Sequence, residues 1–336
     1  MPFKLCVVGC GNIAERCHGP SYKKYQIDNF NLELTACCDI NGERAAAFAK
    51  KFGFSRHYTN YKEMLQQENP TAVCLLVSEQ YIAEIGIGIM NMGFPLFTEK
   101  PPGKNINETR ALIDTAEKTG VIHQVGYNRR GIPILQKLKE MLAEPLAKKE
   151  LQYIRYDLYR VGRFDDDFSD TAVHGIDAVR YITGADYKKV RFSYQVLSHQ
   201  DKTAKNIYMD CLMTSGVHAQ LCFCTVSGIV LERVVANAMN NTWMANIPIW
   251  EYGYDVPGEL IHVRENKTHI RLSGADLCES DDMYITNGFY NENKGFFDNV
   301  KNKIACQDTF RESLNTVLIK DCISTGKIEF TECPVR

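Results

Sequence analysis

The sequence predicts an α/β protein with two domains: a doubly wound parallel sheet at the N-terminus, followed by an α+β domain with a large, open, mainly antiparallel sheet. Its 336 residues are enough for two domains that each bury a core. Over the first 125 residues, short apolar runs alternate with amphipathic stretches. Beyond Gly126, helical patterns become fewer and long β-rich runs appear. We therefore predict one domain at residues 1–125 and a second at residues 126–336.

The strands of each domain follow from these runs. Those of the first domain are residues 5–8, 32–38, 72–77, 95–98 and 121–126. Because helical patterns lie between most of them, they form βαβ units with right-handed crossovers. Those of the second domain are residues 151–160, 190–197, 206–213, 217–226 and 229–238, before two closing helices at about 291–304 and 310–323. So few helices leave one apolar sheet face uncovered, which predicts a homodimer or homotetramer.

The composition indicates a small partner of little charge. With 45% hydrophobic residues, 24% charged residues and a formal net charge of −2, the chain is expected to bind a neutral or weakly anionic small molecule, and no nucleic acid. The longest apolar run, residues 72–77, is too short for a membrane span, and no secretion signal precedes the first strand, so we expect a cytoplasmic protein. The 13 cysteines are typical of buried thiols. Cys222 and Cys224 have no second pair at zinc spacing, so no metal is expected.

A glycine-rich motif follows the first predicted strand. Residues 9–14 have the sequence Gly-Cys-Gly-Asn-Ile-Ala, the G-x-G-x-x-A pattern of a Rossmann dinucleotide-binding domain. Gly9 permits the tight turn, Gly11 leaves room for a pyrophosphate, and Ala14 allows close packing of helix and strand. The phosphates would meet the N-terminus of the following helix. The residues of this motif that we expect to bind the cofactor are Gly9, Cys10, Gly11, Asn12 and Ile13.

Asp39 ends the second predicted strand, where an acidic side chain accepts hydrogen bonds from the ribose hydroxyls of a dinucleotide. A carboxylate there would repel a 2′-phosphate, which favours NAD over NADP, although Arg44 could reach an adenosine phosphate. Asp39 lies 25 residues after Ala14, further than usual, and we expect residues 19–30 to hold the extra loop. The alternative is that Asp39 only caps the helix that follows it.

A charged pair follows the strand predicted at residues 95–98. Glu99-Lys100-Pro101 stands at the C-terminal end of a parallel strand, where open α/β sheets bind their ligands. A cis bond between Lys100 and Pro101 is compatible with this sequence. The alternative is an exposed ion pair before a helix that begins at proline.

Asp170, His174 and Asp177 are spaced i, i+4 and i+7 in a helical pattern, which predicts two carboxylates and an imidazole on one face. His174 could exchange a proton with a substrate hydroxyl near neutral pH, and Asp170, one turn away, could orient it. A capping aspartate on a polar surface is the alternative.

Taken in order, G-x-G-x-x-A, an aspartate at the ribose position, E-K-P and D-x-x-x-H-x-x-D resemble the glucose–fructose oxidoreductase, inositol dehydrogenase and rhizopine-catabolism (Gfo/Idh/MocA) family. The resemblance continues through residues 125–130 and 313–327. It implies an NAD(P)-dependent dehydrogenase or reductase that transfers a hydride between nicotinamide and a secondary alcohol or ketone of a sugar, cyclitol or sugar derivative. It also implies that the second domain binds the substrate and associates with other subunits through its sheet.

The resemblance also implies roles for single residues. Lys100 would polarise the reacting oxygen, His174 would be the acid/base, and Asp170 would be its partner. The positions of Arg129 and Asp177 match residues that face the substrate. The cofactor site would further include Ser78, Glu99 and Lys100.

Two segments depart from the family pattern. Residues 77–80 (Val-Ser-Glu-Gln) replace a Thr-Pro-Asn run that touches the cofactor, and residues 164–168 (Phe-Asp-Asp-Asp-Phe) replace a glycine triplet before the catalytic aspartate. We expect the first to affect nicotinamide binding and the second to mark an unusual substrate. Two other functions stay open: a glycosidase or lyase that uses transient oxidation by NAD, and a non-catalytic NAD-binding sensor.

Overall fold

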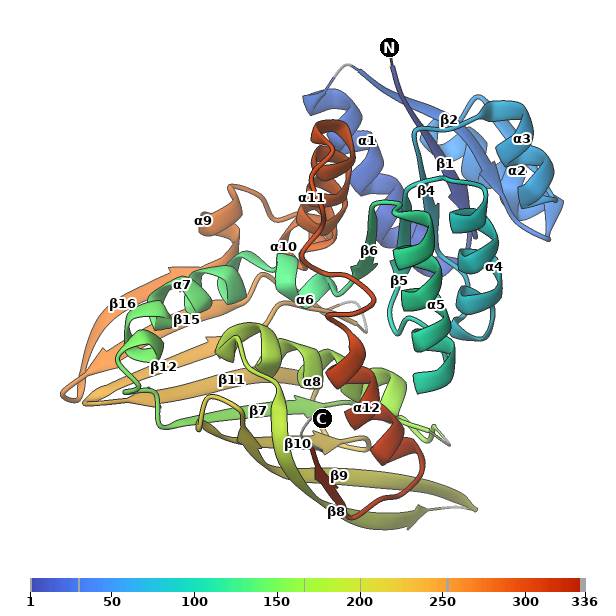
Figure 1. Cartoon of the computed structure of the whole chain (residues 1–336). Coiled ribbons are helices and arrows are strands. Elements are labelled where there is room, and N and C mark those ends of the chain that lie inside the picture. Colours follow the sequence, from blue (N-terminus) through green and yellow to red (C-terminus); the bar gives the residue numbers. More distant parts are fainter. Residues whose placement is uncertain (1, 30, 166, 200, 252–253, 333–336) are drawn as a thin grey trace. The chain divides into compact units, whose positions relative to one another are not determined.

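The computed structural model describes the whole chain except residues 1, 30, 166, 200, 252–253 and 333–336 (Figure 1). The chain forms two compact units, Met1–Asn128 with Gly288–Val317, and Arg129–Asn287 with Leu318–Arg336. The first boundary lies close to the expected one at residue 125. However, residues 288–317, which we had expected in the second domain, belong to the first unit.

The first unit contains a six-stranded parallel sheet with the order β3-β2-β1-β4-β5-β6. Because the order reverses between β1 and β4, their carboxyl ends form the switch point at which such sheets bind ligands. This is the predicted doubly wound Rossmann sheet. One strand that we did not predict is the short β3, where two of three side chains are exposed. The strands are β1 Phe3–Val8, β2 Leu32–Cys38, β3 Arg56–Tyr58, β4 Ala72–Leu75, β5 Leu96–Glu99 and β6 His123–Gly126.

Residues 19–28, where we expected a loop, form a helix. A π-helix, η1 (Ala14–His18), passes directly into α1 (Gly19–Asp28), so the additional residues before β2 lengthen the helix after the glycine motif. The other helices of the first unit are α2 Gly42–Phe52, α3 Tyr61–Glu68, α4 Glu79–Asn91, α5 Ile106–Thr119 and α11 Phe289–Asn302.

Helix α11 belongs to the first unit because its aromatic side chains complete that unit's core. The ring of Phe297 lies 5.6 Å from Phe3 of β1 and 5.1 Å from Tyr25 of α1, and Phe296 lies 5.7 Å from Phe97 of β5. Phe296 and Phe297 are fully buried. Apolar periodicity predicted this helix correctly but could not show which domain it packs on.

The second unit contains a nine-stranded sheet with the order β16-β15-β12-β11-β7-β10-β9-β8-β17. Its pairs are antiparallel except for the parallel pair β7–β10, which confirms the mainly antiparallel sheet. The strands are β7 Tyr153–Tyr159, β8 Tyr187–His199, β9 Lys202–Met213, β10 His218–Cys224, β11 Leu231–Ala238, β12 Asn241–Asn246, β15 Glu259–Arg264, β16 Lys267–Ser273 and β17 Glu329–Thr331. A separate hairpin pairs β13 (Ile249–Glu251) with β14 (Tyr254–Val256).

Two long helices, α7 (Pro133–Ala147) and α8 (Ser169–Thr183), cover one face of this sheet (Figure 1). Side chains of β11 are buried at every second position, as expected for a sheet with one covered face. Among the described residues no helix covers the opposite face. The remaining helices are α6 Asn128–Gly131, α9 Gly274–Cys278, α10 Met283–Thr286 and α12 Leu314–Ser324. None of the described helices combines the length and apolarity needed to cross a membrane.

Candidate cofactor and active site

The glycine motif forms a tight loop at the switch point. Gly9 has φ +96°, and a Cβ there would lie 2.4 Å from the carbonyl oxygen of Leu76, so only glycine fits. A Cβ at Gly11 would meet nothing within 4 Å. The helix N-terminus that begins at Asn12 therefore faces an open space, which fits the pyrophosphate of a dinucleotide. Asn12 is exposed and Ile13 half-buried, whereas the side chain of Cys10 is buried.

Asp39 joins this loop to the end of β2. Its carboxylate accepts hydrogen bonds from the backbone N–H groups of Cys10 and Asn41, both at 2.9 Å, and lies 3.5 Å from the guanidinium of Arg44. The side chain that caps α2 is Asn41, which accepts a hydrogen bond from the Arg44 N–H at 3.0 Å. The capping alternative for Asp39 is therefore wrong. Asp39 lies beside the phosphate loop, where a ribose would follow the pyrophosphate.

The expected residues after β4 and β5 lie at the same edge of the sheet. Ser78 precedes α4, is exposed and makes no capping hydrogen bond. Glu99 ends β5, and Lys100 is the next residue. The peptide bond between Lys100 and Pro101 is cis. Because the carboxyl ends of parallel strands share one edge, these residues lie along the edge that carries the glycine loop.

Glu99 is part of a hydrogen-bond network that the sequence did not predict. One carboxylate oxygen lies 2.8 Å from Nε2 of the fully buried His18, and the other accepts the Lys100 N–H at 3.1 Å. Nδ1 of His18 lies 3.0 Å from the side-chain amide nitrogen of Asn293 on α11. Glu99 thereby links the backbone N–H of Lys100 to His18 in η1, the helical segment after the phosphate loop. His18 and Asn293 gave no sequence signal because their partners are 81 and 275 residues away.

His18, Glu99 and Glu292 are the described group whose ligand atoms lie close enough for a metal ion, all within 4.8 Å of one another. His18 and Glu99 are hydrogen-bonded at 2.8 Å. Two ligands of a tetrahedral zinc would be roughly 3.3 Å apart. The geometry is therefore that of a hydrogen-bonded pair.

Asp170, His174 and Asp177 lie on α8, as the spacing predicted. Asp170 and His174 are half-buried, but Asp177 is 1% exposed and receives two hydrogen bonds from Arg130, at 2.7 and 2.6 Å. Asp177 therefore lies in a buried ion pair and not on a shared surface with the other two. Its expected contact with the substrate stays a prediction that this environment does not favour.

The ion-pair partner of Asp170 is a residue that we did not predict. Nζ of Lys320, on α12, lies 2.8 Å from Asp170 Oδ1. We had expected Asp170 to orient His174, and that pairing stays a prediction. Lys320 lies 150 residues further along the chain, so no local pattern indicated it.

Arg129 is also held in a buried ion pair. Its guanidinium donates to both oxygens of Glu232 at 3.0 and 2.9 Å, and Glu232 further accepts from Arg160 at 3.0 Å and from the Tyr156 hydroxyl. Burial alone would raise the pKa of Glu232, but the charges of Arg129 and Arg160 lower it to about 2. Arg129 is thus a fixed, nearly buried cation, and its contact with the substrate stays a prediction.

The acidic segment before α8 is engaged in local contacts. Asp165 pairs with Arg163, and Asp167 accepts hydrogen bonds from the Ser169 N–H at 2.8 Å and from the Ser324 hydroxyl at 2.5 Å. Asp166 lies outside the described residues. Burial raises the pKa of Asp167, but the hydrogen bonds from Ser324 and Ser169, with the charge of Lys320, bring it below its usual value.

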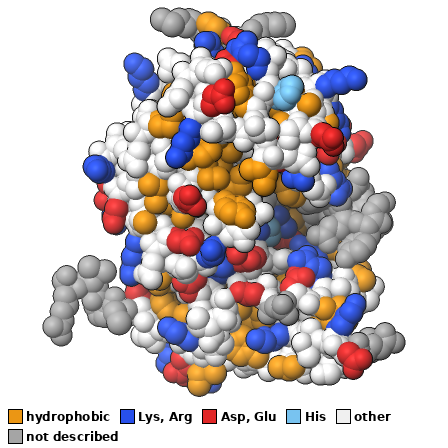
Figure 2. All heavy atoms as spheres, turned by 90° about the vertical axis from the view of Figure 1, so that its right-hand side faces the viewer, with side chains coloured by type: hydrophobic (Ala, Val, Ile, Leu, Met, Phe, Trp, Pro, Cys, Tyr) orange, Lys and Arg blue, Asp and Glu red, His pale blue; other side chains and the backbone are white. Residues whose placement is uncertain are grey.

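On the face of the molecule shown in Figure 2, basic and acidic side chains are interspersed. Among the described residues, this view shows no extended region of a single sign.

The comparison with known families identifies the first unit. Residues 3–127 match the model of the family described as "Oxidoreductase family, NAD-binding Rossmann fold", GFO_IDH_MocA. Over these residues the chain is similar to the Gfo/Idh/MocA family, and the match identifies an NAD-binding Rossmann fold in the first unit. The matched range contains the glycine loop, Asp39, Ser78, Glu99 and Lys100, whereas α8 lies beyond it.

The relatives to which this chain is similar are named as dehydrogenases or as an oxidoreductase. The chain is 26% identical to the myo-inositol 2-dehydrogenase of Thermotoga maritima over 59% of this chain and 60% of the relative. It is 24% identical to the D-glucoside 3-dehydrogenase of Escherichia coli over 54% of each chain. The match to oxidoreductase P35 of Formosa agariphila has 25% identity over 62% of this chain and 70% of the relative. This chain thus spans between about half and 70% of the length of these relatives.

Solved structures share the fold over the whole chain. A levoglucosan dehydrogenase in complex with NADH has a TM-score of 0.82 at 16% identity and covers 100% of both chains. A dehydrogenase from Chromobacterium violaceum has a TM-score of 0.81 at 21% identity, with 97% of this chain and 95% of that chain covered. These similarities confirm both parts of the predicted fold.

Proposed function

We propose that this chain uses NAD to oxidise or reduce a secondary alcohol carbon of a sugar, cyclitol or sugar derivative. The observation that carries the proposal is the switch-point edge of the first unit, where the glycine loop, the Asp39 carboxylate and Lys100 follow neighbouring parallel strands. The substrate class follows from the relatives, which are named for inositol, glucosides and levoglucosan. The proposal assigns cofactor binding to the first unit and substrate binding to the second.

The proposal favours NAD over NADP because Asp39 is buried and already fixed by two N–H donors. A 2′-phosphate beside this carboxylate would be repelled. Arg44 lies within 3.5 Å of Asp39 and would attract such a phosphate, but its side chain is 52% exposed and therefore weakly effective.

In the proposed mechanism, the glycine loop and Asp39 would hold NAD, which would supply hydride transfer at its nicotinamide ring. Lys100, which follows β5 at the ligand-binding edge, stabilises with its positive ammonium the negative charge that develops on the substrate oxygen. His174 accepts the hydroxyl proton in oxidation and returns it in reduction, and Asp170 supports it from one turn away.

We further propose that the chain acts in the cytoplasm as a homodimer or homotetramer. The described cysteines are free thiols, and most are buried, which suits a reducing compartment. The sheet face of the second unit that no described helix covers would carry the contact between subunits.

The test is a panel of sugars and cyclitols with NAD or NADP, followed by the absorbance of the reduced nicotinamide. We expect Lys100→Met and His174→Ala each to lower kcat by about 10²–10⁴-fold and to leave the Kd for NAD within a few-fold. Because both residues serve the same proposed chemical step, the double variant should lose less than the product of the single losses. Lys104→Met and His218→Ala, both at exposed positions, are the controls.

Each other outcome overturns a defined part of the proposal. Near-normal turnover in either variant would make that residue structural. Turnover without accumulation of reduced nicotinamide would indicate the glycosidase or lyase reaction, and NAD binding without turnover on any substrate would indicate the sensor.

A further inference from the structure

Two contacts fix the first turn of α8 to α12 within the second unit (Figure 1). Lys320 Nζ lies 2.8 Å from Asp170 Oδ1, and the Ser324 hydroxyl donates to Asp167 Oδ2 at 2.5 Å. Because Lys320 and Ser324 are four residues apart on one helix, they share a face. The two aspartates lie three residues apart, so one face of α12 holds both.

Lys320 is unusually buried for a lysine. Its side chain is 3% exposed, whereas that of Asp170 is 39% exposed. A lysine is almost never buried so deeply unless its charge is paired. The ammonium therefore has a fixed position in the interior, and the more exposed carboxylate is held against it. Asp170 is thereby fixed one helical turn from His174.

We infer that Lys320 is a positioning residue that holds the Asp170 carboxylate in place for proton transfer by His174. The inference rests on the proposed function, which gives Asp170 and His174 their roles. It also explains the segment 164–168. Of the described aspartates there, Asp165 pairs with Arg163, and Asp167, just before α8, is the second residue held by α12.

The experiment compares Lys320→Met, Lys320→Arg, Asp170→Asn and the Met/Asn double variant, with kcat and the Kd for NAD measured for each. We expect Lys320→Met to lower kcat about ten- to a hundredfold, because it removes the ion pair that fixes Asp170, with the Kd for NAD unchanged. Lys320→Arg should recover most of the activity. In the Asp170→Asn background, Lys320→Met should cause no further loss, because Lys320 acts through Asp170.

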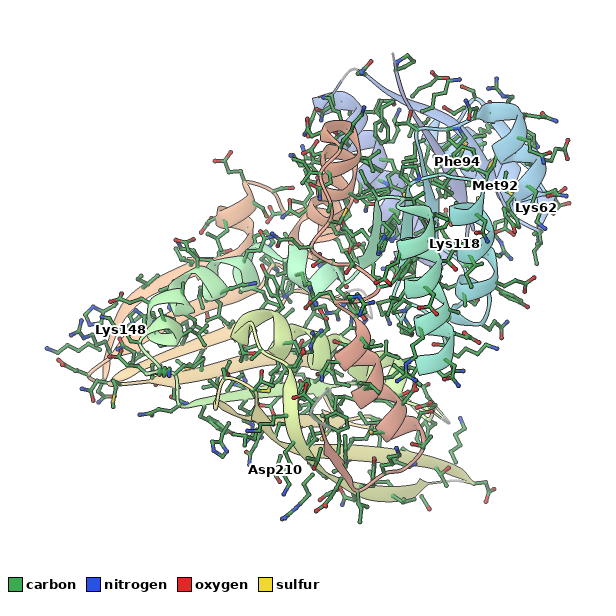
Figure 3. All side chains as sticks on the ribbon, viewed as in Figure 1. Lys62, Met92, Phe94, Lys118, Lys148 and Asp210 are labelled. Carbon is green, nitrogen blue, oxygen red and sulfur yellow. The ribbon has the colours of Figure 1, made fainter. Side chains whose placement is uncertain are left out.

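The matched control is Lys148→Met. Lys148 is also a lysine of the second unit with a carboxylate partner, Glu144, but its side chain is 56% exposed and points away from the body of the unit (Figure 3). We expect no change in kcat. Lys320→Met should fold, because methionine has a similar volume and water can reach the exposed side of Asp170. If it does not, Lys320→Gln is measured under the same expectations.

The outcomes separate this inference from the proposed function. The inference is overturned, and the proposed function is not, if Lys320→Met leaves kcat unchanged. The same holds if Lys320→Met lowers kcat as much in the Asp170→Asn variant as in the unmodified protein. A normal kcat for Asp170→Asn overturns the proposed role of Asp170 and the inference with it. Absence of turnover in the unmodified chain on every substrate overturns the proposed function itself.

Discussion

Asp39 is fixed in place before any cofactor binds, because two backbone N–H groups and one guanidinium hold it. A pre-organised acceptor costs little entropy when a ligand binds. The same fixation keeps the carboxylate at the place where a 2′-phosphate would lie. Under the proposed function, affinity for NAD and discrimination against NADP therefore depend on the same side chain.

We expect Asp39→Ala to raise the Kd for NAD by about ten- to a hundredfold and to bring the Kd values for NAD and NADP closer together. The substitution removes both the ribose acceptor and the repulsion of the 2′-phosphate. Titration with each nucleotide measures both effects, and Asp114→Ala, at an exposed position on α5, is the control. An unchanged Kd for NAD would leave Asp39 with a purely structural role in the loop.

Glu232 is the carboxylate that pairs with two buried guanidinium groups of the second unit, those of Arg129 and Arg160. Its pKa of about 2 lies below the ordinary value of 4.5. A lowered pKa in the folded state contributes stability that is complete above the ordinary pKa and is lost as the pH falls toward the lowered one. The shift corresponds to about 3 kcal/mol in the free energy of unfolding.

We expect Glu232→Gln to lower the free energy of unfolding by about 3–5 kcal/mol at pH 7, because it leaves two buried guanidinium groups without a counter-charge. The difference from the unmodified protein should shrink as the pH falls from about 4.5 to about 2, since the unmodified Glu232 then takes up a proton. Urea unfolding across this range measures the difference. Glu144→Gln, at an exposed ion pair, should leave the free energy of unfolding unchanged. If the difference between Glu232→Gln and the unmodified protein stays constant with pH, the lowered pKa of Glu232 is contradicted.

At the scale of elements, α8 lies unusually close to the sheet. A Cβ at Gly175 would come within 2.9 Å of the rings of Phe223 on β10 and Tyr156 on β7, and both rings are fully buried. The glycine thus sets the distance between the sheet and the helix that carries His174. The sequence predicted α8 from its apolar spacing, but this distance depends on two strands that are far away in the chain.

Gly175→Ala should therefore destabilise the protein. Alanine improves helix propensity by about 1 kcal/mol, but overpacking against fixed rings costs about 1–3 kcal/mol. We expect a lower melting temperature and a lower kcat, since α8 and His174 must shift. Gly295→Ala on α11 is the matched control, because a Cβ there would meet nothing within 4 Å, and it should be neutral or stabilising. If Gly175→Ala and Gly295→Ala change the melting temperature equally, the close packing of α8 on the sheet at Gly175 is contradicted.

Some other helices and strands can be predicted from the local sequence pattern alone, and some cannot. The strands β1, β2, β4, β5 and β6 were predicted because buried parallel strands are continuous apolar runs. Helix α7 and strands β12, β15, β16 and β17 were not. In β16, four of seven residues are exposed and none is buried. An edge strand of this kind has no apolar signal, so only its partner β15 defines it.

At the scale of the whole molecule, the helix-free sheet face predicts association of subunits. Val235 and Met244 pair on adjacent strands and lie on this face, since Val234 and Ala236 belong to the buried core on the other. We expect a dimer or tetramer by light scattering at micromolar concentration, and a monomer for Val235→Lys, which places a charge in the contact. Ile27→Lys, at a position 68% exposed on α1, should leave the mass unchanged. A monomeric unmodified protein would contradict the prediction.

Residues 288–317 belong to the first unit although they follow most of the second unit in the chain, so the first unit cannot be completed until late in synthesis on the ribosome. Phe3, Tyr25 and Phe97 emerge early but meet Phe296 and Phe297 only after eight of the nine strands in the sheet of the second unit have been made. At 5–20 residues per second, the intervening segment takes roughly ten to thirty seconds to translate. During that time the nascent Rossmann sheet has an unfinished aromatic core, which is the kind of surface that chaperones bind.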